Sequence, residues 1–369
     1  MGSQLSHHQQ ITKENQPAST KSLGASGSNS IASDSNSIAF DRSRHRDDSE
    51  NQLCILGVEQ MLAKENYYTW LLRDESRMEN LDISHMKINK SPYRRSRIAM
   101  LGSCNGLVCA RVSEDGTKTV LWNPTTKEFR YLPKPMTLIP RIVGPPNYVI
   151  MGFGYDDHNK DYKLVRYELG EKQQIEIQVF TQSSNSWRQL IRDLSVYTPV
   201  DPSTAPVALN GALHWYTNAR DEQKEVIFSF NLRDEEFFEL PAPPLKKISD
   251  TFRLAKWRGS LVALHNRDFW VMMSDTEEPW TKLFTISMAY RIYEPWLCGI
   301  WKDQLLVYYD ECKELILYEH PAISGESLSQ RSQQLKKLVS VQAKQVDYRF
   351  NVLDYVESQV SVHPLLSSS

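Results

Sequence analysis

The chain has 369 residues, of which 40% are hydrophobic and 24% are charged, as is typical of a protein with a folded core. Its formal net charge of −2 excludes the strongly basic class that attracts nucleic acid or an anionic membrane. It contains no run of 18 apolar residues and no charged-then-apolar N-terminal segment, so we expect neither stable membrane insertion nor secretion. The predicted location is cytoplasmic or nuclear.

The five cysteines support a reducing compartment. Cys54, Cys104, Cys109, Cys298 and Cys312 are an odd set without paired spacing, which favours free thiols over a disulfide framework. Cys104 and Cys109 flank a turn, but a zinc site needs a second pair of ligands that the sequence does not supply. We therefore interpret both as small buried hydrophobic residues.

The N-terminal residues 1–52 are predicted to be a disordered, serine-rich tail. The first 50 residues hold twelve serines and a single Phe, Trp or Tyr side chain, Phe40, so they cannot bury enough apolar surface to fold. Gly2 and Ser6 fit the N-myristoylation template, which short sequences also match by chance. Residues 53–65 are predicted to be a short linker or helix, with a strand as the alternative.

From residue 67 the chain alternates apolar and polar residues, and residues 67–84 are predicted to form two strands. A strand–turn–strand unit then recurs five times, with turns at Gly106, Asp157, Gly211, Gly259 and Asp303. These turns are 44 to 54 residues apart, and a second strand pair follows each unit. Four strands recurring at this period are typical of the blades of a β-propeller.

The turn chemistry agrees with this interpretation. Asn105-Gly106 and Asn210-Gly211 suit the type I′ hairpin turn, which needs positive φ at both central residues. Arg258-Gly259 and Lys302-Asp303 occupy the same place with weaker turn formers.

The two ends of the repeat region suggest ring closure. Residues 67–84 are predicted to form the outer half of one blade, and residues 350–362 its inner half, so that no sheet edge stays free. The fold class is therefore an all-β, kelch-like propeller over residues 66–362, with six four-stranded blades or, alternatively, seven, and a tail at residues 363–369.

Six sequence blocks carry a resemblance to a known family. They are GSCNGLVCA (102–110), LWNPTTKEFRYLP (121–133), GFGYDDHNKDYKLVRY (152–167), ALNGALHWY (208–216), FNLRDEEFFELPAPP (230–244) and YVESQVSV (355–362). Together they resemble the plant F-box-associated domain of the type found in S-locus F-box and F-box/kelch proteins. The resemblance implies a substrate-recognition subunit of an SCF ubiquitin ligase, whose partners are a target protein for ubiquitination, a Skp adaptor and a cullin.

The sequence departs from that family at its N-terminus. An F-box is expected just before residue 66, but residues 1–52 show no apolar residues at helical spacing. The adaptor and cullin are thus expected only if the full-length form has an F-box. A scaffold or decoy that acts without the ligase is the alternative, and a propeller enzyme is the weakest hypothesis. We predict no catalytic residues, no metal and no cofactor.

Several residues invite a chemical interpretation that packing explains better. The strand tryptophans are predicted to fill the space between blades, and His214 is predicted to be a structural hydrogen-bonding residue. Asp156, Asp157 and Asp161 do not fit a calcium-loop spacing and are predicted to form a solvated turn. The tryptophans in question are Trp122, Trp187, Trp215, Trp270 and Trp280.

Partner binding is predicted in the loops, because propeller strands are committed to their ladders. The loops between the second and third strands of the blades, with the blade-to-blade connections, lie on one face of the predicted ring. The predicted partner-binding residues on that face are Glu114, Asp115, Glu171, Lys172, Arg220, Asp221 and Lys224. A basic cluster from Lys87 to Arg97 is predicted to be an exposed loop, with nuclear localisation or phosphate binding as the alternative.

Overall fold

The structure is a computed structural model in which every described residue belongs to one compact unit, Ser43–Ser369. Every regular element among these residues is a β-strand, and none of them forms a helix long and apolar enough to cross a membrane. The described ranges are 53–61, 66–74, 77–81, 83, 98–112, 118–136, 148–170, 174–192, 197–199, 205–219, 224–245, 252–265, 267–273, 278–285, 296–309, 314–318, 341–342 and 351–364. The predicted tail at residues 1–52 and the basic cluster lie outside them.

Three sheets, which we call B, C and E, each consist of four antiparallel strands in chain order. The strands of sheet B are β4 (Ala99–Cys104), β5 (Leu107–Arg111), β6 (Thr119–Trp122) and β7 (Phe129–Tyr131). Those of sheet C are β8 (Tyr148–Asp156), β9 (Asp161–Leu169), β10 (Ile175–Thr181) and β11 (Ser186–Gln189). Those of sheet E are β17 (Arg253–Trp257), β18 (Ser260–His265), β19 (Asp268–Met272) and β20 (Trp280–Thr285).

Sheet F follows the same plan, whereas sheets A and D vary it. Sheet A joins the two ends of the unit in the order β25 (Asn351–Val356), β1 (Leu53–Met61), β2 (Asn66–Asp74) and β3 (Arg77–Leu81). In sheet D, β12 (Tyr197–Pro199) and β13 (Val207–Leu209) both pair with β14 (Ala212–Ala219), followed by β15 (Lys224–Asn231) and β16 (Phe237–Pro241). Sheet F contains β21 (Trp296–Trp301), β22 (Gln304–Tyr309), β23 (Glu314–Tyr318) and β24 (Val341–Gln342).

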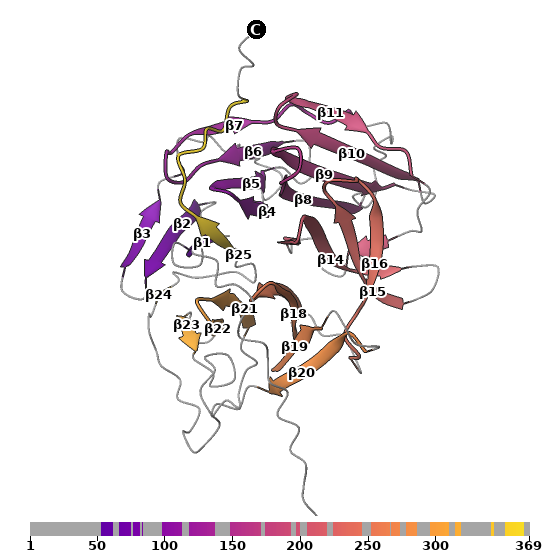
Figure 1. Ribbon diagram of the computed structural model, residues 1–369. Helices are drawn as coiled ribbons and strands as arrows, with labels where there is room; N and C mark the ends of the chain where they lie inside the picture. The colour runs from indigo at the N-terminus through magenta and orange to yellow at the C-terminus, as the bar shows by residue number, and fades with distance from the viewer. Residues whose placement is uncertain are drawn as a thin grey trace, which may run out of the picture. The chain divides into compact units, whose positions relative to one another are not determined.

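The first strands of successive sheets contact one another. Strand β4 contacts β25 and β8, β17 contacts β13 and β21, and β21 contacts β25. Figure 1 shows the sheets of this unit following one another around an axis. The prediction of an all-β propeller is confirmed.

The predicted type I′ turns are confirmed by the backbone. Both central residues have positive φ in Asn105-Gly106 (45° and 83°) and Asn210-Gly211 (51° and 72°). Arg258-Gly259 (47° and 72°) and Lys302-Asp303 (47° and 59°) do the same. A lysine, an arginine and an aspartate therefore adopt the left-handed conformation, which costs more for them than for glycine.

Residues 53–65 were predicted to be a linker or helix with a strand as the alternative, and the strand alternative is confirmed for residues 53–61. Residues 53–61 form strand β1, which pairs with β2 on one side and with β25 on the other. The C-terminal residues 350–362 were expected to supply two inner strands, but they supply one, β25, and the chain leaves the sheet after Val356. β1 provides the second strand because its neighbours offer backbone partners on both edges.

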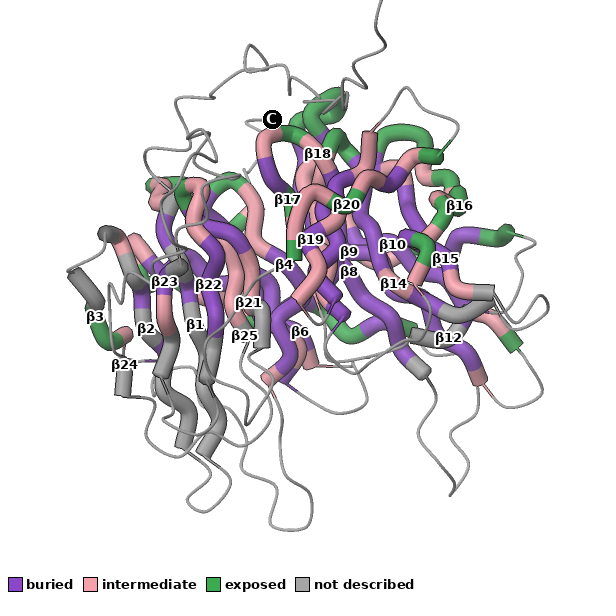
Figure 2. The backbone as a smooth tube through the Cα atoms, turned by 90° about the horizontal axis from the view of Figure 1, so that it is seen from below, coloured by how far each residue is buried: buried purple, intermediate pink, exposed green. Residues whose placement is uncertain are grey.

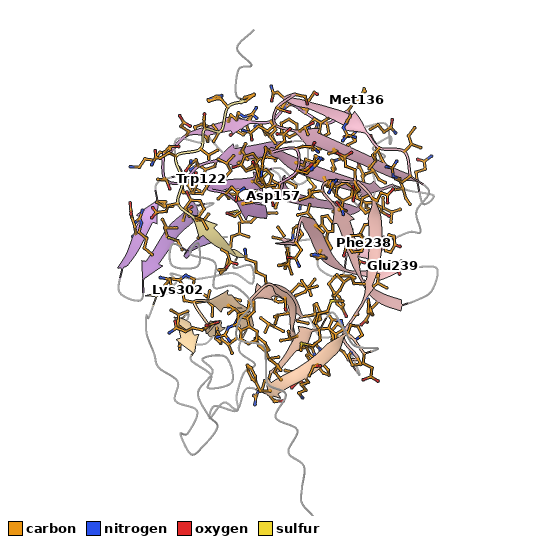
Figure 3. All side chains as sticks on the ribbon, viewed as in Figure 1. Trp122, Met136, Asp157, Phe238, Glu239 and Lys302 are labelled. Atoms are coloured by element: carbon orange, nitrogen blue, oxygen red, sulfur yellow. The ribbon has the colours of Figure 1, made fainter. Side chains whose placement is uncertain are left out.

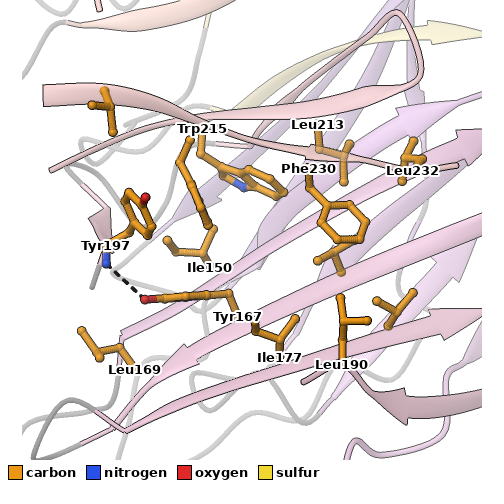
Figure 4. Close-up of a cluster of buried hydrophobic side chains, with 14 residues drawn as sticks. Ile150, Tyr167, Leu169, Ile177, Leu190, Tyr197, Leu213, Trp215, Phe230 and Leu232 are labelled. Atoms are coloured by element: carbon orange, nitrogen blue, oxygen red, sulfur yellow. Dashed lines mark hydrogen bonds between the residues drawn. The ribbon is translucent and has the colours of Figure 1, made fainter. Parts of the chain in front are cut away.

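The hydrophobic core lies between neighbouring sheets. Buried side chains of sheets A and B form one cluster, and separate clusters lie between B and C, between C and D, and between D and E. Figure 2 shows buried residues along the middles of the strands. The cluster between C and D is the one in Figure 4, where the Tyr197 backbone N–H donates to the Tyr167 hydroxyl at 3.1 Å. Each sheet therefore needs its neighbours to bury its apolar side chains.

Candidate protein-binding surfaces

The strands of each sheet are antiparallel, so their connections alternate between two ends. We call one the turn end; it carries the tight turns β4–β5, β6–β7, β8–β9 and β10–β11 and their equivalents. We call the other the loop end; it carries the β5–β6, β9–β10 and β14–β15 loops and the connections from one sheet to the next. The predicted partner-binding residues belong to the loop end.

Most of those predicted residues lie outside the described part of the chain. Glu114, Asp115, Glu171, Lys172, Arg220 and Asp221 are in this group, as is the predicted acylation site Gly2. Lys224 begins strand β15, where its backbone pairs with Ala219. The bases of two loops are closed by hydrogen bonds from Val112 N to Lys118 O at 2.9 Å and from Gly170 N to Gln174 O at 2.8 Å.

A buried polar cluster lies between sheets B and C, toward the loop end. We call Arg166, Glu168, Glu176 and Gln178 the B–C polar cluster. The Arg166 guanidinium pairs with the Glu168 carboxylate, and both side chains are almost fully buried. Gln178 Nε2 donates to Glu176 Oε1 at 2.6 Å and to the carbonyl of Met136. Charged groups this deeply buried are costly unless each polar atom has a partner.

Hydrogen-bonding capacity remains in this cluster. Nε and Nη1 of Arg166 and Oε1 of Gln178 are buried and lack a partner. Oγ1 of Thr119 also lacks one, and strand alternation places it on the same side of β6 as Leu121, which packs between B and C. These donors and acceptors could engage a polar ligand or ordered water.

Exposed apolar side chains occur at the same end of sheets B and C. Met136 is 72% exposed and Ile191 is 83% exposed, and each follows the last strand of its sheet. Tyr131, at the end of β7, is 39% exposed, with the Lys118 ammonium 5.5 Å from its ring centre. Figure 3 places Met136 at the rim beside β11. Large exposed hydrophobic residues near polar groups are common at protein-binding sites.

The turn end of sheets B and C is covered by the segment that follows β25. After β25, residues 357–364 cross the outer turns of these sheets, and we call this segment the strap. Asn123 and Gln182 donate side-chain hydrogen bonds to strap carbonyls, and Arg130 donates to the Val362 carbonyl. The strap and the B–C polar cluster therefore lie at opposite ends of the same two sheets.

A second polar network joins sheets C and D. The Lys163 ammonium lies 2.7 Å from Asp156 Oδ2 and 2.9 Å from Glu235 Oε1, and it donates to the Leu232 carbonyl at 2.5 Å. Burial alone would raise the pKa of Asp156, but hydrogen bonds from Lys163 and Asn159 outweigh it and lower that pKa to about 2. This network stabilises the contact between the two sheets.

The predicted solvated turn at residues 156–161 is partly wrong. Asp157 is exposed, but Asp156 and Asp161 are buried. Asp156 accepts hydrogen bonds from the backbone of His158 and Asn159, at 3.0 and 3.1 Å. Asp161 accepts from Ser183 Oγ at 2.5 Å, so two of the three carboxylates organise turns instead of meeting water.

The structural interpretations of the aromatic residues and of His214 are confirmed. His214 is buried, with its Nδ1 2.9 Å from Ser229 Oγ, and burial lowers its pKa. Indole N–H groups of three tryptophans donate to carbonyls of the preceding sheet. These are Trp187 to Pro133 at 2.7 Å, Trp215 to Met151 at 3.2 Å and Trp280 to Pro241 at 2.8 Å. Trp122 and Trp270 also pack in clusters between sheets.

The cysteine interpretation holds for Cys109, which is buried, whereas Cys104 is only partly buried. Cys54, Cys104, Cys109 and Cys298 are free thiols, and burial raises the pKa values of Cys104 and Cys109. Cys312 lies outside the described ranges. Within those ranges, no group of three or more His, Cys, Asp or Glu side chains could hold a metal ion.

Neither the B–C polar cluster nor the strap contacts were predicted from the sequence. The sequence does contain a signal for the cluster, because Arg166 and Glu168 alternate strictly with Val165, Tyr167 and Leu169 in one strand. Polar positions in such a pattern commonly face water, but both faces of a propeller blade are covered by neighbours. The strap signal was Asn123 in the turn Asn-Pro-Thr-Thr, whose side chain can reach beyond its own turn.

Comparisons with known proteins agree on the type of domain. The family model described as "F-box associated beta propeller domain" matches residues 59–362. The F-box/kelch-repeat protein At3g23880 of Arabidopsis thaliana is 30% identical over 234 residues, which cover 61% of this chain and 62% of that protein. The F-box protein CPR1 of the same plant is 26% identical over 249 residues, 59% of this chain and 60% of that protein.

The match does not extend over whole proteins. The chain aligns with less than two thirds of the length of these curated relatives. Among solved structures, the chain from "Crystal structure of Nidogen/Laminin Complex" is 10% identical, with a TM-score of 0.45, and the match covers 83% of this chain and 99% of that one.

Proposed function

The chain belongs to the F-box-associated β-propeller family, and from this premise we propose that it recognises a target protein for an SCF-type ubiquitin ligase. The family match over residues 59–362 carries the proposal, since it includes strands of all six sheets. The similarity to F-box proteins of Arabidopsis thaliana supports it. In this role the propeller binds and orients its target without catalysing a reaction.

The target is proposed to bind at the loop end. The exposed side chains of Tyr131, Met136 and Ile191 support this choice, as does the unpartnered hydrogen-bonding capacity of Arg166 and Gln178 beneath them. The loop residues predicted to contribute charge are Glu114, Asp115, Glu171, Lys172, Arg220, Asp221 and Lys224. Oppositely charged partners would gain specificity and association rate from these groups.

The complete ring is proposed to contain six blades, with β25 closing the last of them. The pairing of β25 with β1 supports this count, because it joins the two ends of the unit within one sheet. Closure by both termini removes the free sheet edges at which an open ring would aggregate.

The binding face can be tested by charge reversal at matched positions. The loop-end double variant R220E/K224E is compared with the turn-end double variant K127E/K160E, whose lysines are exposed. Proteins that co-purify with the wild-type chain are quantified by mass spectrometry. We expect specific partners to decrease at least about tenfold with the loop-end variant and to stay with the turn-end variant. The opposite pattern would reject the loop end as the binding face.

A second candidate function is a scaffold or decoy that binds targets without a ligase. It differs from the first candidate only in whether the chain also binds a Skp adaptor. Purified Skp adaptor is titrated against the purified chain, with a known F-box protein as positive control. Saturable adaptor binding supports the ligase subunit, whereas retained target capture without adaptor binding supports the scaffold. Loss of both would overturn both candidates.

A further inference from the structure

The strap is held through its backbone. Asn123 Nδ2 donates to the carbonyls of Ser358 at 3.0 Å and Val360 at 2.7 Å. Gln182 Nε2 lies 3.4 Å from the carbonyls of Ser361 and His363. Carbonyl groups are present in every peptide, so these contacts recognise the backbone of the strap more than a particular sequence.

Three side-chain positions of the strap are nevertheless selective, the first being Glu357, whose carboxylate lies 2.8 Å from the Arg73 guanidinium of sheet A. A Cβ atom on Gly106 would lie 2.0 Å from the Cβ of Ser358, so that turn needs glycine and the strap needs a small residue. Gly211 and Gly259 occupy equivalent turns, where an added Cβ would meet nothing within 4 Å. Val362 is fully buried in the cluster between sheets B and C, so the strap needs an aliphatic residue four positions later.

Asn123 has an internal comparison in Asn231 of sheet D. The backbone N–H of each closes its turn at 2.9 Å, to Glu128 O and Glu236 O respectively. The Oδ1 of each also accepts backbone N–H groups within that turn, from Thr125 at 2.9 Å in sheet B and from the equivalent residues in sheet D. The side-chain amide of Asn123 is fully buried and reaches the strap in addition. The extra function of Asn123 is thus separable from turn formation.

We propose that the turn end of sheets B and C is a binding track for a peptide segment, and that the strap is its resident occupant. The partner is a segment with a small residue followed by an aliphatic residue four positions later, where the strap has Ser358 and Val362. The segment lies across the track with its carbonyls toward Asn123, Arg130 and Gln182. A partner segment binds when the strap is displaced, so the strap occludes this surface.

The test uses the full chain with its own strap released. Val362→Asp places a carboxylate in a buried apolar site and leaves the residues of the track unchanged. A fluorescein-labelled peptide with the sequence of residues 357–364 is titrated by fluorescence anisotropy, after thermal unfolding has confirmed a cooperative fold. We expect saturable binding to the V362D chain and at least about tenfold weaker binding to the wild type, whose tethered strap competes at high effective concentration.

Matched variants locate the binding on the track. In the V362D background, Asn123→Asp keeps the turn acceptor and removes the amide donor, so peptide affinity should fall at least about tenfold. Asn231→Asp makes the same change in sheet D and should leave affinity unchanged. Equal binding by both double variants, or no binding to V362D, overturns the proposal. If V362D does not fold, Ser358→Leu releases the strap at its contact with Gly106, and Gln182→Leu weakens the track.

Discussion

The two faces of strands β9 and β10 differ in chemistry although neighbouring residues build them. The face toward sheet D carries Val165, Tyr167, Leu169, Ile177 and Val179, and the face toward sheet B carries Arg166, Glu168, Glu176 and Gln178 at its loop end. Both sets are buried, so exposure to water does not explain the polar set. The apolar face supplies packing energy, whereas a buried charged set is weak evidence for stability. We therefore interpret the apolar face as stabilising the fold and the polar face as a candidate for partner binding.

The largest effect is expected on the apolar face. Tyr167→Ala removes a fully buried ring that packs edge-on against Phe228 and accepts a hydrogen bond from Tyr197 N. The free energy of unfolding should fall by about 4 kcal/mol, the usual cost of truncating a large buried side chain. Denaturant titration measures this change. A loss below about 1 kcal/mol would mean that this face does not carry the packing.

The polar face should respond differently to single and double changes. Arg166→Met removes the guanidinium that pairs with Glu168 in a buried site, so unfolding free energy should fall by about 3 kcal/mol. R166M/E168L removes both charges and should regain most of that loss. A double variant less stable than R166M would show that this pair stabilises the fold, contrary to our interpretation.

A pH dependence should arise from the ion network between sheets C and D. Because Lys163 and Asn159 lower the pKa of Asp156 to about 2, below its ordinary value of about 3.9, its contribution is present above pH 4. That contribution, about 2 kcal/mol, is lost as the pH falls from about 4 to 2. Asp156→Asn should flatten this part of the stability profile, measured by denaturant titration at each pH. Parallel profiles of the two proteins would contradict the assignment.

The smallest effect on stability is expected at the exposed rim. Ile191 is 83% exposed, so Ile191→Asn should change unfolding free energy by less than about 0.5 kcal/mol. Target capture should fall if this side chain belongs to the binding surface. A large loss of stability would place Ile191 in the packing, and unchanged capture would remove it from the surface.

The sequence predicted the fold better than the site. Periodic strands and Asn-Gly turns are local signals, and they predicted the propeller and the turn geometry at Gly106 and Gly211. The strand role of residues 53–61 depends on pairing with residues almost 300 positions away, which no local pattern records. The B–C polar cluster was not predicted, because alternation shows which residues share a face of the strand but not whether a neighbouring sheet covers that face. The strap contacts were not predicted, because the Asn123 carboxamide forms hydrogen bonds both within its own turn and with the strap, which is distant in the sequence.

The most direct test of partner recognition at the loop end is crosslinking of the chain to its co-purified partner. An amine-reactive crosslinker samples lysines at both ends of the sheets. Among the described residues, loop-end lysines include Lys118, Lys134 and Lys224, and turn-end lysines include Lys127, Lys160 and Lys302. We expect partner crosslinks to concentrate on the loop-end set, and R220E/K224E to reduce them. Crosslinks concentrated on the turn-end set would contradict recognition at the loop end.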